Sequence, residues 1–197
     1  MTNISQKVLY SLDVLVPFTR NYAQKIHASE LSRQLHLPQR TVSRKIELLE
    51  NAHLLQYQKK GRNKYYFFNL QKTISISLIT IIECYKEIQF TLQHPQVALL
   101  LKELSTHCPI ILFGSYAKGK ETSHSDLDLV LFSEEKKELQ QIITKYPFQV
   151  QPQWVSFRLF EKRLREAQPL AKEIIKDHLL FGEKERLISL FKRYCHQ

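Results

Sequence analysis

The segment from Pro109 to Phe132 places the strongest constraint on how this chain can fold. It contains two short apolar runs, Pro109–Phe113 and Leu127–Phe132, separated by a polar stretch with two glycines. Short apolar runs bounded by glycine and polar residues are typical of buried strands. The sequence therefore predicts two strands of one sheet, joined by a polar connection.

Polar residues suited to phosphate and metal chemistry stand at the ends of these two strands. Residues two apart project from the same face of a strand, so Asp126 and Asp128 can share divalent cations that hold a triphosphate. Gly114 permits close approach of a phosphate, and Ser115 with nearby amides can donate hydrogen bonds to it. We predict Asp126 and Asp128 as catalytic and metal-binding residues, and Gly114, Ser115 and Lys118 as nucleotide-binding residues.

This arrangement resembles the nucleotidyltransferases of the DNA polymerase beta superfamily, in particular their small, minimal domains. Their pattern is Gly-Ser, about ten residues, and then Asp-x-Asp, and Phe113–Phe132 is similar to it throughout. The resemblance continues more weakly to about Phe191. It implies transfer of a nucleoside monophosphate from an NTP substrate to an acceptor hydroxyl, with Mg²⁺ as cofactor.

The chain departs from that family at the third carboxylate. The family usually has it on a later strand, but the matching residues Phe148–Val155 contain no Asp or Glu. The nearest downstream acid is Glu161, which we expect on the following helix. Two functions stay open: a nucleotidyltransferase, or a transcriptional regulator whose degenerate transferase domain only senses nucleotide. Minimal domains of this kind are often antitoxins, so the resemblance also raises a HEPN-type toxin as a partner.

The stretch from Gly114 to Lys120 also matches most of the P-loop spacing G-x-x-x-x-G-K. That motif ends in a Ser or Thr that binds magnesium, whereas Glu121 stands here. A P-loop core also needs more parallel strands than the rest of the chain offers. We therefore favour the nucleotidyltransferase interpretation.

Positive charge is concentrated in the first third of the chain. Residues 1–70 hold 11 Lys or Arg against 4 Asp or Glu, whereas residues 71–197 hold 18 against 15. A basic region of this kind indicates a polyanionic partner, with nucleic acid as the first candidate.

The same third has the pattern of helices followed by a hairpin. Helical spacing over residues 4–18 puts four apolar side chains on one face: Ile4, Val8, Leu12 and Leu15. A short helix opens near Ala28, and a further helix follows Pro38 with Val42, Ile46 and Leu49 inward. Two β-rich runs joined around Gly61 then predict a hairpin.

Residues 5–70 are similar to winged helix-turn-helix regulators of the ArsR/MarR kind. The resemblance implies binding of double-stranded DNA, usually as a dimer, although such folds also serve as protein-interaction modules. Exposed cations at the start of the third helix and in the wing can reach bases and phosphates. We predict five DNA-binding residues: Arg40, Ser43, Arg44, Lys60 and Arg62.

Residues 71–93 favour one long helix. Its apolar stripe is close to a heptad seam, and a homodimer contact and an internal packing face stay open as its role. The stripe consists of Ile74, Leu78, Ile81, Tyr85, Ile88 and Leu92. Beyond it we expect strands at 109–113, 127–132 and 148–157, and helices at 95–105, 115–120, 134–144, 158–166, 169–180 and 183–194.

We therefore expect an α+β protein of three parts. These are a winged helix-turn-helix domain (1–70), a linker or dimerisation helix (71–93), and a polymerase-beta-like α/β domain with a small mixed sheet (94–197). No apolar run is long enough to span a bilayer and the N-terminus lacks signal-peptide features, so we expect a cytoplasmic protein without a membrane partner. Cys84, Cys108 and Cys195 fit neither a zinc site nor a disulfide framework.

Overall fold

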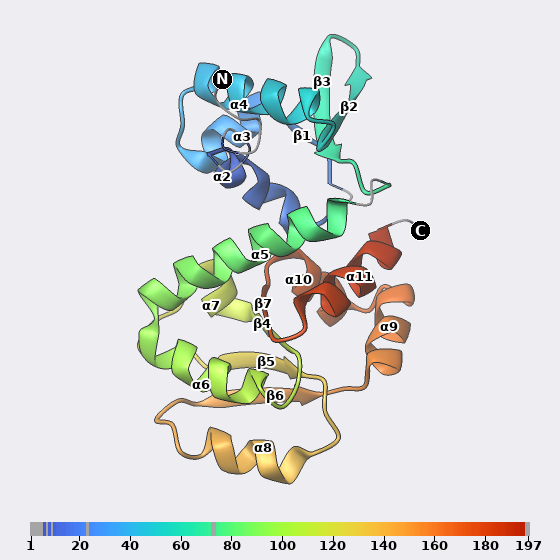
Figure 1. Ribbon diagram of the computed structural model, residues 1–197. Coiled ribbons are helices and arrows are strands. Elements are labelled where there is room, and N and C mark those ends of the chain that lie inside the picture. Colours follow the sequence, from blue (N-terminus) through green and yellow to red (C-terminus); the bar gives the residue numbers. More distant parts are fainter. Residues whose placement is uncertain (1–5, 7, 9, 23, 72–73, 196–197) are drawn as a thin grey trace. The chain divides into compact units, whose positions relative to one another are not determined.

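The computed structural model describes residues 6, 8, 10–22, 24–71 and 74–195, apart from the side chain of Cys195 (Figure 1). The chain divides into two compact units. The first unit consists of Met1–Ile82 together with Cys195–Gln197, and the second unit is Glu83–Tyr194. Helix α5, Ile74–Gln93, contributes to both, and it confirms the long helix expected here. No helix in the described part of the chain is long and apolar enough to cross a membrane.

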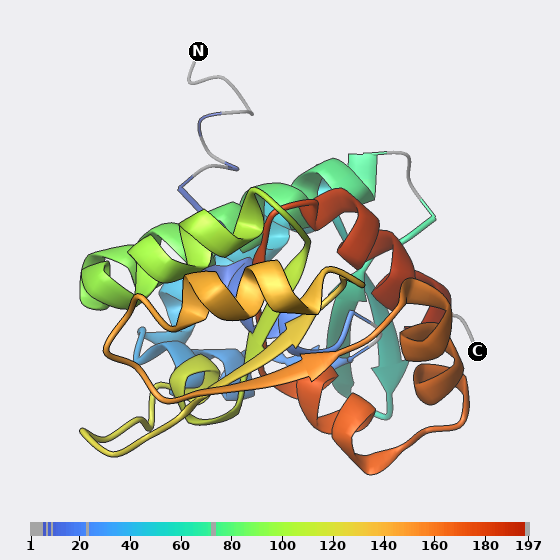
Figure 2. The same cartoon turned by 90° about the horizontal axis from the view of Figure 1, so that it is seen from below.

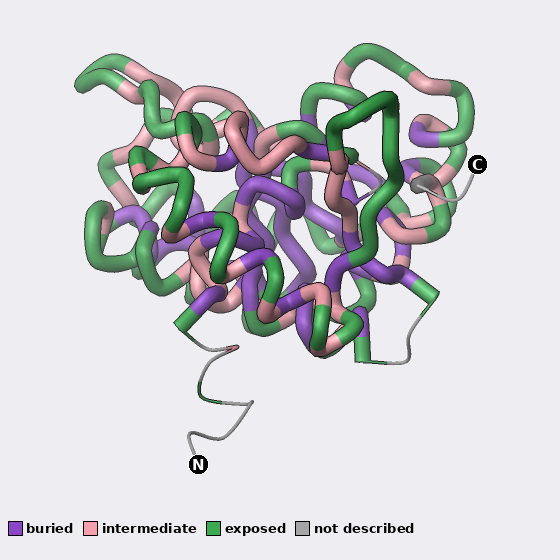
Figure 3. The backbone as a smooth tube through the Cα atoms, turned by 90° about the horizontal axis from the view of Figure 1, so that it is seen from above, coloured by how far each residue is buried: buried purple, intermediate pink, exposed green. Residues whose placement is uncertain are grey.

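The first unit combines short helices with a small antiparallel sheet of order β1-β3-β2. Before α5, its elements are α2 Leu12–Leu15, the 3-10 helix η1 Val16–Arg20, β1 Ile26–His27, α3 Ala28–Leu35, α4 Gln39–Asn51, β2 Leu55–Lys60 and β3 Asn63–Phe68. The hairpin predicted around Gly61 is confirmed, because Lys60 pairs with Asn63 across a turn in which Gly61 has φ of 62°. The residues of that turn are exposed, as the colouring of the chain by burial in Figure 3 shows.

The spacing of apolar residues in α4 explains how this helix packs. Val42, Ile46 and Leu49 recur every three or four residues and are fully or almost fully buried, as predicted. Leu31 of α3 and Phe68 of β3 belong to the same unit's core. The opposite edge of α4, with Arg40, Ser43, Arg44 and Glu47, is consequently exposed to solvent.

The helical stretch predicted over residues 4–18 is interrupted and ends early, because Tyr10 and Ser11 form a turn and the α-helix does not extend past Leu15. Helix α2 ends at Leu15, and the chain continues as the 3-10 helix η1 with Pro17 in its first turn. Proline lacks a backbone N–H and cannot continue the α-helical hydrogen bonding, which accounts for the change. Val8 is helical, as predicted, but lies before α2, and Ile4 lies outside the described residues.

The second unit holds a four-stranded sheet of order β6-β5-β4-β7. Strand β4 pairs antiparallel with both β5 and β7, whereas β5 pairs parallel with β6, so the small mixed sheet is confirmed. After α5 its elements are α6 Pro95–Ser105, β4 Ile110–Phe113, α7 Gly114–Lys118, β5 Leu127–Leu131, α8 Lys136–Ile143, β6 Val150–Trp154, α9 Phe157–Arg165, α10 Pro169–Lys176, β7 Leu179–Phe181 and α11 Lys184–Cys195.

Helices cover both faces of this sheet (Figure 2). Alternate residues of the strands, such as Leu112 and Leu129, form one core with the end of α5, α6 and α8. Residues between them, such as Ile111, point to the other face, where α10 packs against β4. The central strands are therefore apolar on both sides, which explains their continuous apolar runs.

Strand β7 was not predicted. The helix expected over 169–180 ends at Lys176, and Leu179–Phe181 pairs with β4 instead. A short, uniformly apolar run has no alternation that separates a strand from a helix, and its partner strand lies far away in sequence. Gly182 directly follows this strand, and its φ of +81° is one that L side chains rarely adopt.

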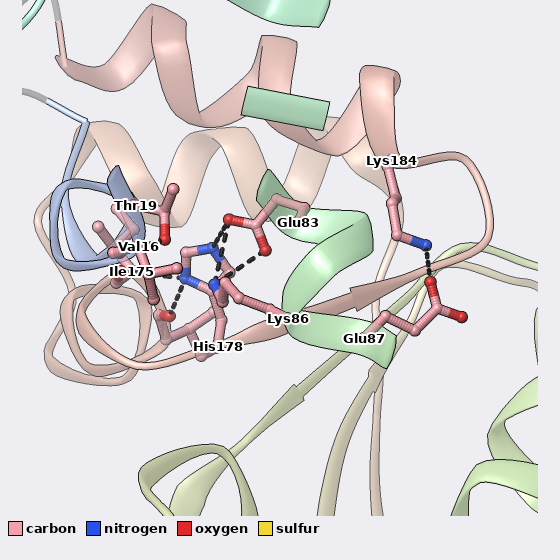
Figure 4. A network of polar contacts seen from close by, with 9 residues as sticks. Val16, Thr19, Glu83, Lys86, Glu87, Ile175, His178 and Lys184 are labelled. Carbon is pink, nitrogen blue, oxygen red and sulfur yellow. Dashed lines mark hydrogen bonds and ion pairs between the residues drawn. The ribbon is translucent and has the colours of Figure 1, made fainter. Parts of the chain in front are cut away.

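A buried polar cluster joins α5 to the segment between α10 and β7 (Figure 4). Glu83 is fully buried and receives a hydrogen bond of 2.8 Å from Lys86, while His178 lies 3.5 Å from its other oxygen. Burial by itself raises the pKa of Glu83, but Lys86 and His178 outweigh it and hold that pKa below the ordinary value. Lys86 and His178 therefore stabilise the negative charge of the buried Glu83 carboxylate.

Candidate functional site

The predicted aspartates lie at the start of β5. Asp126 directly precedes the strand, and Asp128 is its second residue, opposite Phe113 of β4. The alternation of a strand directs both carboxylates to the same face, whereas the intervening Leu127 is buried on the other. Two acidic groups are thus held where β4 turns into α7.

Gly114 lies against one of these carboxylates. Its φ is +73°, and a Cβ at this position would stand 2.0 Å from Oδ2 of Asp128. Any side chain here would displace the Asp128 carboxylate, besides adopting a strained backbone conformation. The glycine is thus required by the close approach of Asp128, a cause that differs from the phosphate approach that the sequence suggests.

A glutamine of the neighbouring strand β6 contacts one of the two aspartates. Gln151 of β6 is the Cα partner of Asp128, and its Nε2 donates a hydrogen bond of 2.5 Å to Oδ2 of Asp126. It lies within the segment Phe148–Val155, where the sequence lacks a third carboxylate. Sequence reasoning did not identify Gln151, because only the parallel pairing of β5 with β6 aligns it with the aspartates.

The predicted nucleotide-binding lysine is held by an acidic partner. The Nζ of Lys118 lies 2.6 Å from Glu173 of α10, and Glu173 raises the pKa of Lys118 above its ordinary value through this hydrogen bond. Ser115 lies on the same short helix, α7, and is half-buried. Glu173 was also missed, since nothing near it in sequence connects it with the Gly-Ser turn.

Negative charge accumulates at Asp128. Its pKa is raised, first by burial and then by the nearby carboxylates of Asp126 and Glu173, while Lys118 acts in the opposite direction. A cation among these carboxylates would relieve their repulsion. Mg²⁺ is commonly held by one or two carboxylates together with substrate phosphates, and Asp126 with Asp128 supplies such oxygen donors. Among the described residues there is no group of three or more His, Cys, Asp or Glu suited to a metal ion.

Two further acids, Glu161 and Glu121, lie against other basic side chains. Glu161 is on α9, as expected, and its carboxylate lies 3.6 Å from Arg193. Glu121 lies 3.2 Å from His94. The P-loop interpretation does not fit, because residues from Gly114 onward form helix α7 and the sheet is mostly antiparallel.

The five residues predicted to contact DNA lie in the first unit and are all exposed. Arg40, Ser43 and Arg44 stand on the outward edge at the start of α4, while Lys60 and Arg62 flank the hairpin turn. In the described structure none of the four cations takes part in an ion pair. Neighbouring Lys45, by contrast, lies 2.6 Å from Asp13.

Comparison with known proteins bears on the second unit. Residues 95–191 match the family model described as "Nucleotidyltransferase domain". This stretch contains Gly114, Asp126, Asp128 and Gln151, and the match supports a nucleotidyltransferase domain here. A search of curated proteins and a search of solved structures each found no match.

Proposed function

We propose that this protein is a DNA-binding nucleotidyltransferase, in which an acceptor hydroxyl loses its proton and bonds to the α-phosphorus of an NTP, so that the nucleoside monophosphate is transferred and pyrophosphate is released. The observation that carries the proposal is the paired carboxylate of Asp126 and Asp128 against Gly114, inside the stretch that matches the nucleotidyltransferase model. Transfer of this kind requires mainly the positioning of a triphosphate and compensation of its charge.

Each site residue has a role in that transfer. Asp126 and Asp128 would hold Mg²⁺, which supplies charge compensation for the triphosphate when it is bound. Gly114 leaves room for the Asp128 carboxylate, and Ser115 at the start of α7 can donate a hydrogen bond to a phosphate oxygen. Lys118 adds a cation whose place is maintained by Glu173.

Incubation with Mg²⁺ and each of the four NTPs, labelled in the α-phosphate that is transferred, with and without cell lysate, tests this activity. We expect labelling of an acceptor by the wild type and its loss in Asp126→Ala with Asp128→Ala. Glu134→Ala with Glu135→Ala, on the exposed turn before α8, removes the same charge elsewhere and should retain labelling. Absence of labelling with every NTP in every condition would contradict the proposed transfer.

One observation favours a second function, that of a regulator that senses nucleotide without catalysis. Gln151, an amide, stands beside Asp126 in the segment where related enzymes usually carry a third acid. Binding of NTP in isothermal titration calorimetry without labelling of any acceptor would support this sensor. Pairing with a toxin protein stays a prediction of the family resemblance, to be tested by co-purification.

We also propose that the first unit is a winged helix that binds double-stranded DNA. What supports this is the exposure of Arg40, Arg44, Lys60 and Arg62 on the start of α4 and on the hairpin, without ion-pair partners among the described residues. Exposed cations of this kind can displace counterions from phosphates, which makes binding dependent on salt.

Fluorescence anisotropy with duplex DNA at several salt concentrations tests the second proposal. Arg44→Ala with Arg62→Ala should weaken binding at least tenfold and lower the salt slope by about two, because each arginine neutralises about one phosphate. Arg158→Ala with Arg165→Ala removes two exposed arginines from α9 and should leave affinity nearly unchanged. If both double variants weaken DNA binding equally, the loss of affinity reflects only the lower net charge, and the proposed DNA-binding surface is contradicted.

A further inference from the structure

Helix α10 lies on the face of the sheet from which the two site aspartates project. Phe113 of β4 is the Cα partner of Asp128, and Ile111, two residues earlier in β4, points to the same face. That is the face on which α10 packs against β4. The acidic residue of this helix, Glu173, is therefore brought to the aspartates' side of the sheet.

Glu173 pairs with the cation that we predict to bind the nucleotide. Its Oε1 lies 2.6 Å from Nζ of Lys118, and both side chains reach the solvent, with exposed fractions of 48% and 33%. An exposed ion pair of this kind adds little stability, so a ligand with more charge can replace one partner. Burial, Asp126 and Glu173 together raise the pKa of Asp128, so the charge of Glu173 acts close to the predicted metal-binding carboxylates.

The position of Glu173 suits a role other than that of a metal ligand. In the described part of the chain, no three acidic, His or Cys side chains are grouped so that they could hold one ion, and Glu173 thus stands apart from the Asp126 and Asp128 pair. Strand β6 places Gln151 beside Asp126, and a neutral amide is no base at neutral pH. Glu173 is a carboxylate on this face that remains available for proton transfer.

We propose that Glu173 is the general base of the transfer reaction, and that Lys118 occupies it until a triphosphate binds. The inference rests on the proposed nucleotidyl transfer and adds the order in which its substrates act. A triphosphate presents several negative charges, so it attracts Lys118 more strongly than one carboxylate does. When Lys118 turns to the phosphates, the Glu173 carboxylate becomes free to accept a hydrogen bond from the acceptor hydroxyl.

The chemical step is a proton transfer coupled to substitution at phosphorus. Glu173 takes the proton of the acceptor hydroxyl while the hydroxyl oxygen forms a bond to the α-phosphorus of the NTP. The bond from that phosphorus to the oxygen bridging to the β-phosphate breaks, and pyrophosphate leaves with the electron pair. Glu173 afterwards releases the proton to water and pairs with Lys118 again. The acceptor is consequently activated only while the triphosphate is bound.

Titration calorimetry with each NTP and Mg²⁺ tests the release of Lys118 without requiring transfer. Glu173→Gln removes the competing carboxylate charge and should tighten NTP binding about threefold. Lys118→Ala removes a cation that binds the phosphates and should weaken NTP binding about tenfold. Glu166→Gln breaks a comparable exposed pair, 3.7 Å from Lys162, and should leave the affinity unchanged. An NTP affinity that is unchanged or weaker in Glu173→Gln would overturn the proposed exchange.

Initial rates of labelling at saturating α-labelled NTP, with cell lysate as the source of acceptor, test the base. Glu173→Gln should lower the rate by about a hundredfold or more, whereas Glu166→Gln should retain it. Sodium formate should restore labelling by Glu173→Ala about tenfold, because a small carboxylate can replace the missing base, but should not restore labelling by Asp128→Ala.

Two outcomes would overturn the base and leave the transfer itself standing. One is labelling by Glu173→Gln within about tenfold of the wild type, which is less than a general base contributes. The other is an equal effect of formate on Glu173→Ala and Asp128→Ala. A wild type that labels nothing would instead contradict the transfer, and the base with it.

Discussion

The two units use charge in opposite ways. On the first unit, four cations are exposed and take part in no ion pair among the described residues: Arg40, Arg44, Lys60 and Arg62. At the Gly-Ser turn of the second unit, Lys118 and Asp126 are held by Glu173 and Gln151. Unpaired surface charge suits a polyanion of many phosphates, whereas constrained charge suits one small ligand in one orientation.

The largest effect that would sharpen this comparison is expected at Gly114. Gly114→Ala places a Cβ 2.0 Å from the Asp128 carboxylate and should reduce labelling by NTP at least a hundredfold. Gly119→Ala is the matched control, since Gly119 also has positive φ, +63°, but has nothing within 4 Å of its Cβ position. Both variants should be destabilised by about 1–2 kcal/mol in urea unfolding, as a result of backbone strain. If the two variants label the acceptor equally, the contact between Gly114 and Asp128 is not needed for activity.

The next effect concerns the buried cluster of the second unit. Glu83→Gln leaves Lys86 and His178 without their buried carboxylate, and we expect the free energy of unfolding to fall by about 3 kcal/mol. Because the pKa of Glu83 is lowered in the folded chain, this contribution is complete above its ordinary value of 4.5. It disappears as the pH falls through the folded value.

Urea unfolding of wild type and Glu83→Gln at a series of pH values measures this contribution. The difference between the two should be constant at neutral pH and shrink under acid conditions. Glu138→Gln, an exposed acid on α8, serves as the control and should change stability little. A difference that grows on acidification would show that Glu83 is neutral in the folded protein.

A smaller effect, of opposite sign, is expected at Gln151. Gln151→Asp adds a carboxylate beside Asp126 and Asp128, and should raise Mn²⁺ affinity about tenfold in calorimetric titration. Gln153→Asp, which points to the same face one step further along β6, is the control. An unchanged metal affinity in Gln151→Asp would mean that this position does not join the site.

The smallest effect distinguishes paired from unpaired cations within the first unit. Arg44→Ala should weaken DNA binding with little change in stability, because this arginine has no ion pair to break among the described residues. Lys45→Ala breaks the pair with Asp13 and should cost up to about 1 kcal/mol of stability, with less effect on DNA affinity. Anisotropy and urea unfolding on both variants provide the comparison. If both substitutions weaken DNA binding equally, the lack of an ion pair at Arg44 does not make it more important for DNA binding than Lys45.

Local patterns in the sequence predicted those features that depend on near neighbours. The inward face of α4, the turn at Gly61 and the long helix α5 all follow from spacing or from glycine and are confirmed. The helix predicted up to residue 18 ends at Leu15 because Pro17 changes the backbone hydrogen bonding. In each case the cause lies within a few residues.

What the sequence alone determined is therefore the chemistry at the ends of β4 and β5, Gly-Ser followed by Asp126 and Asp128, and the basic character of the first third. Only the tertiary structure decided what surrounds them. Gln151 and Glu173 reach the site through a parallel strand pair and a helix packed on the sheet, and β7 exists because it pairs with distant β4. Contacts between residues far apart in the chain leave no local periodicity, because each forms only when the sheet assembles.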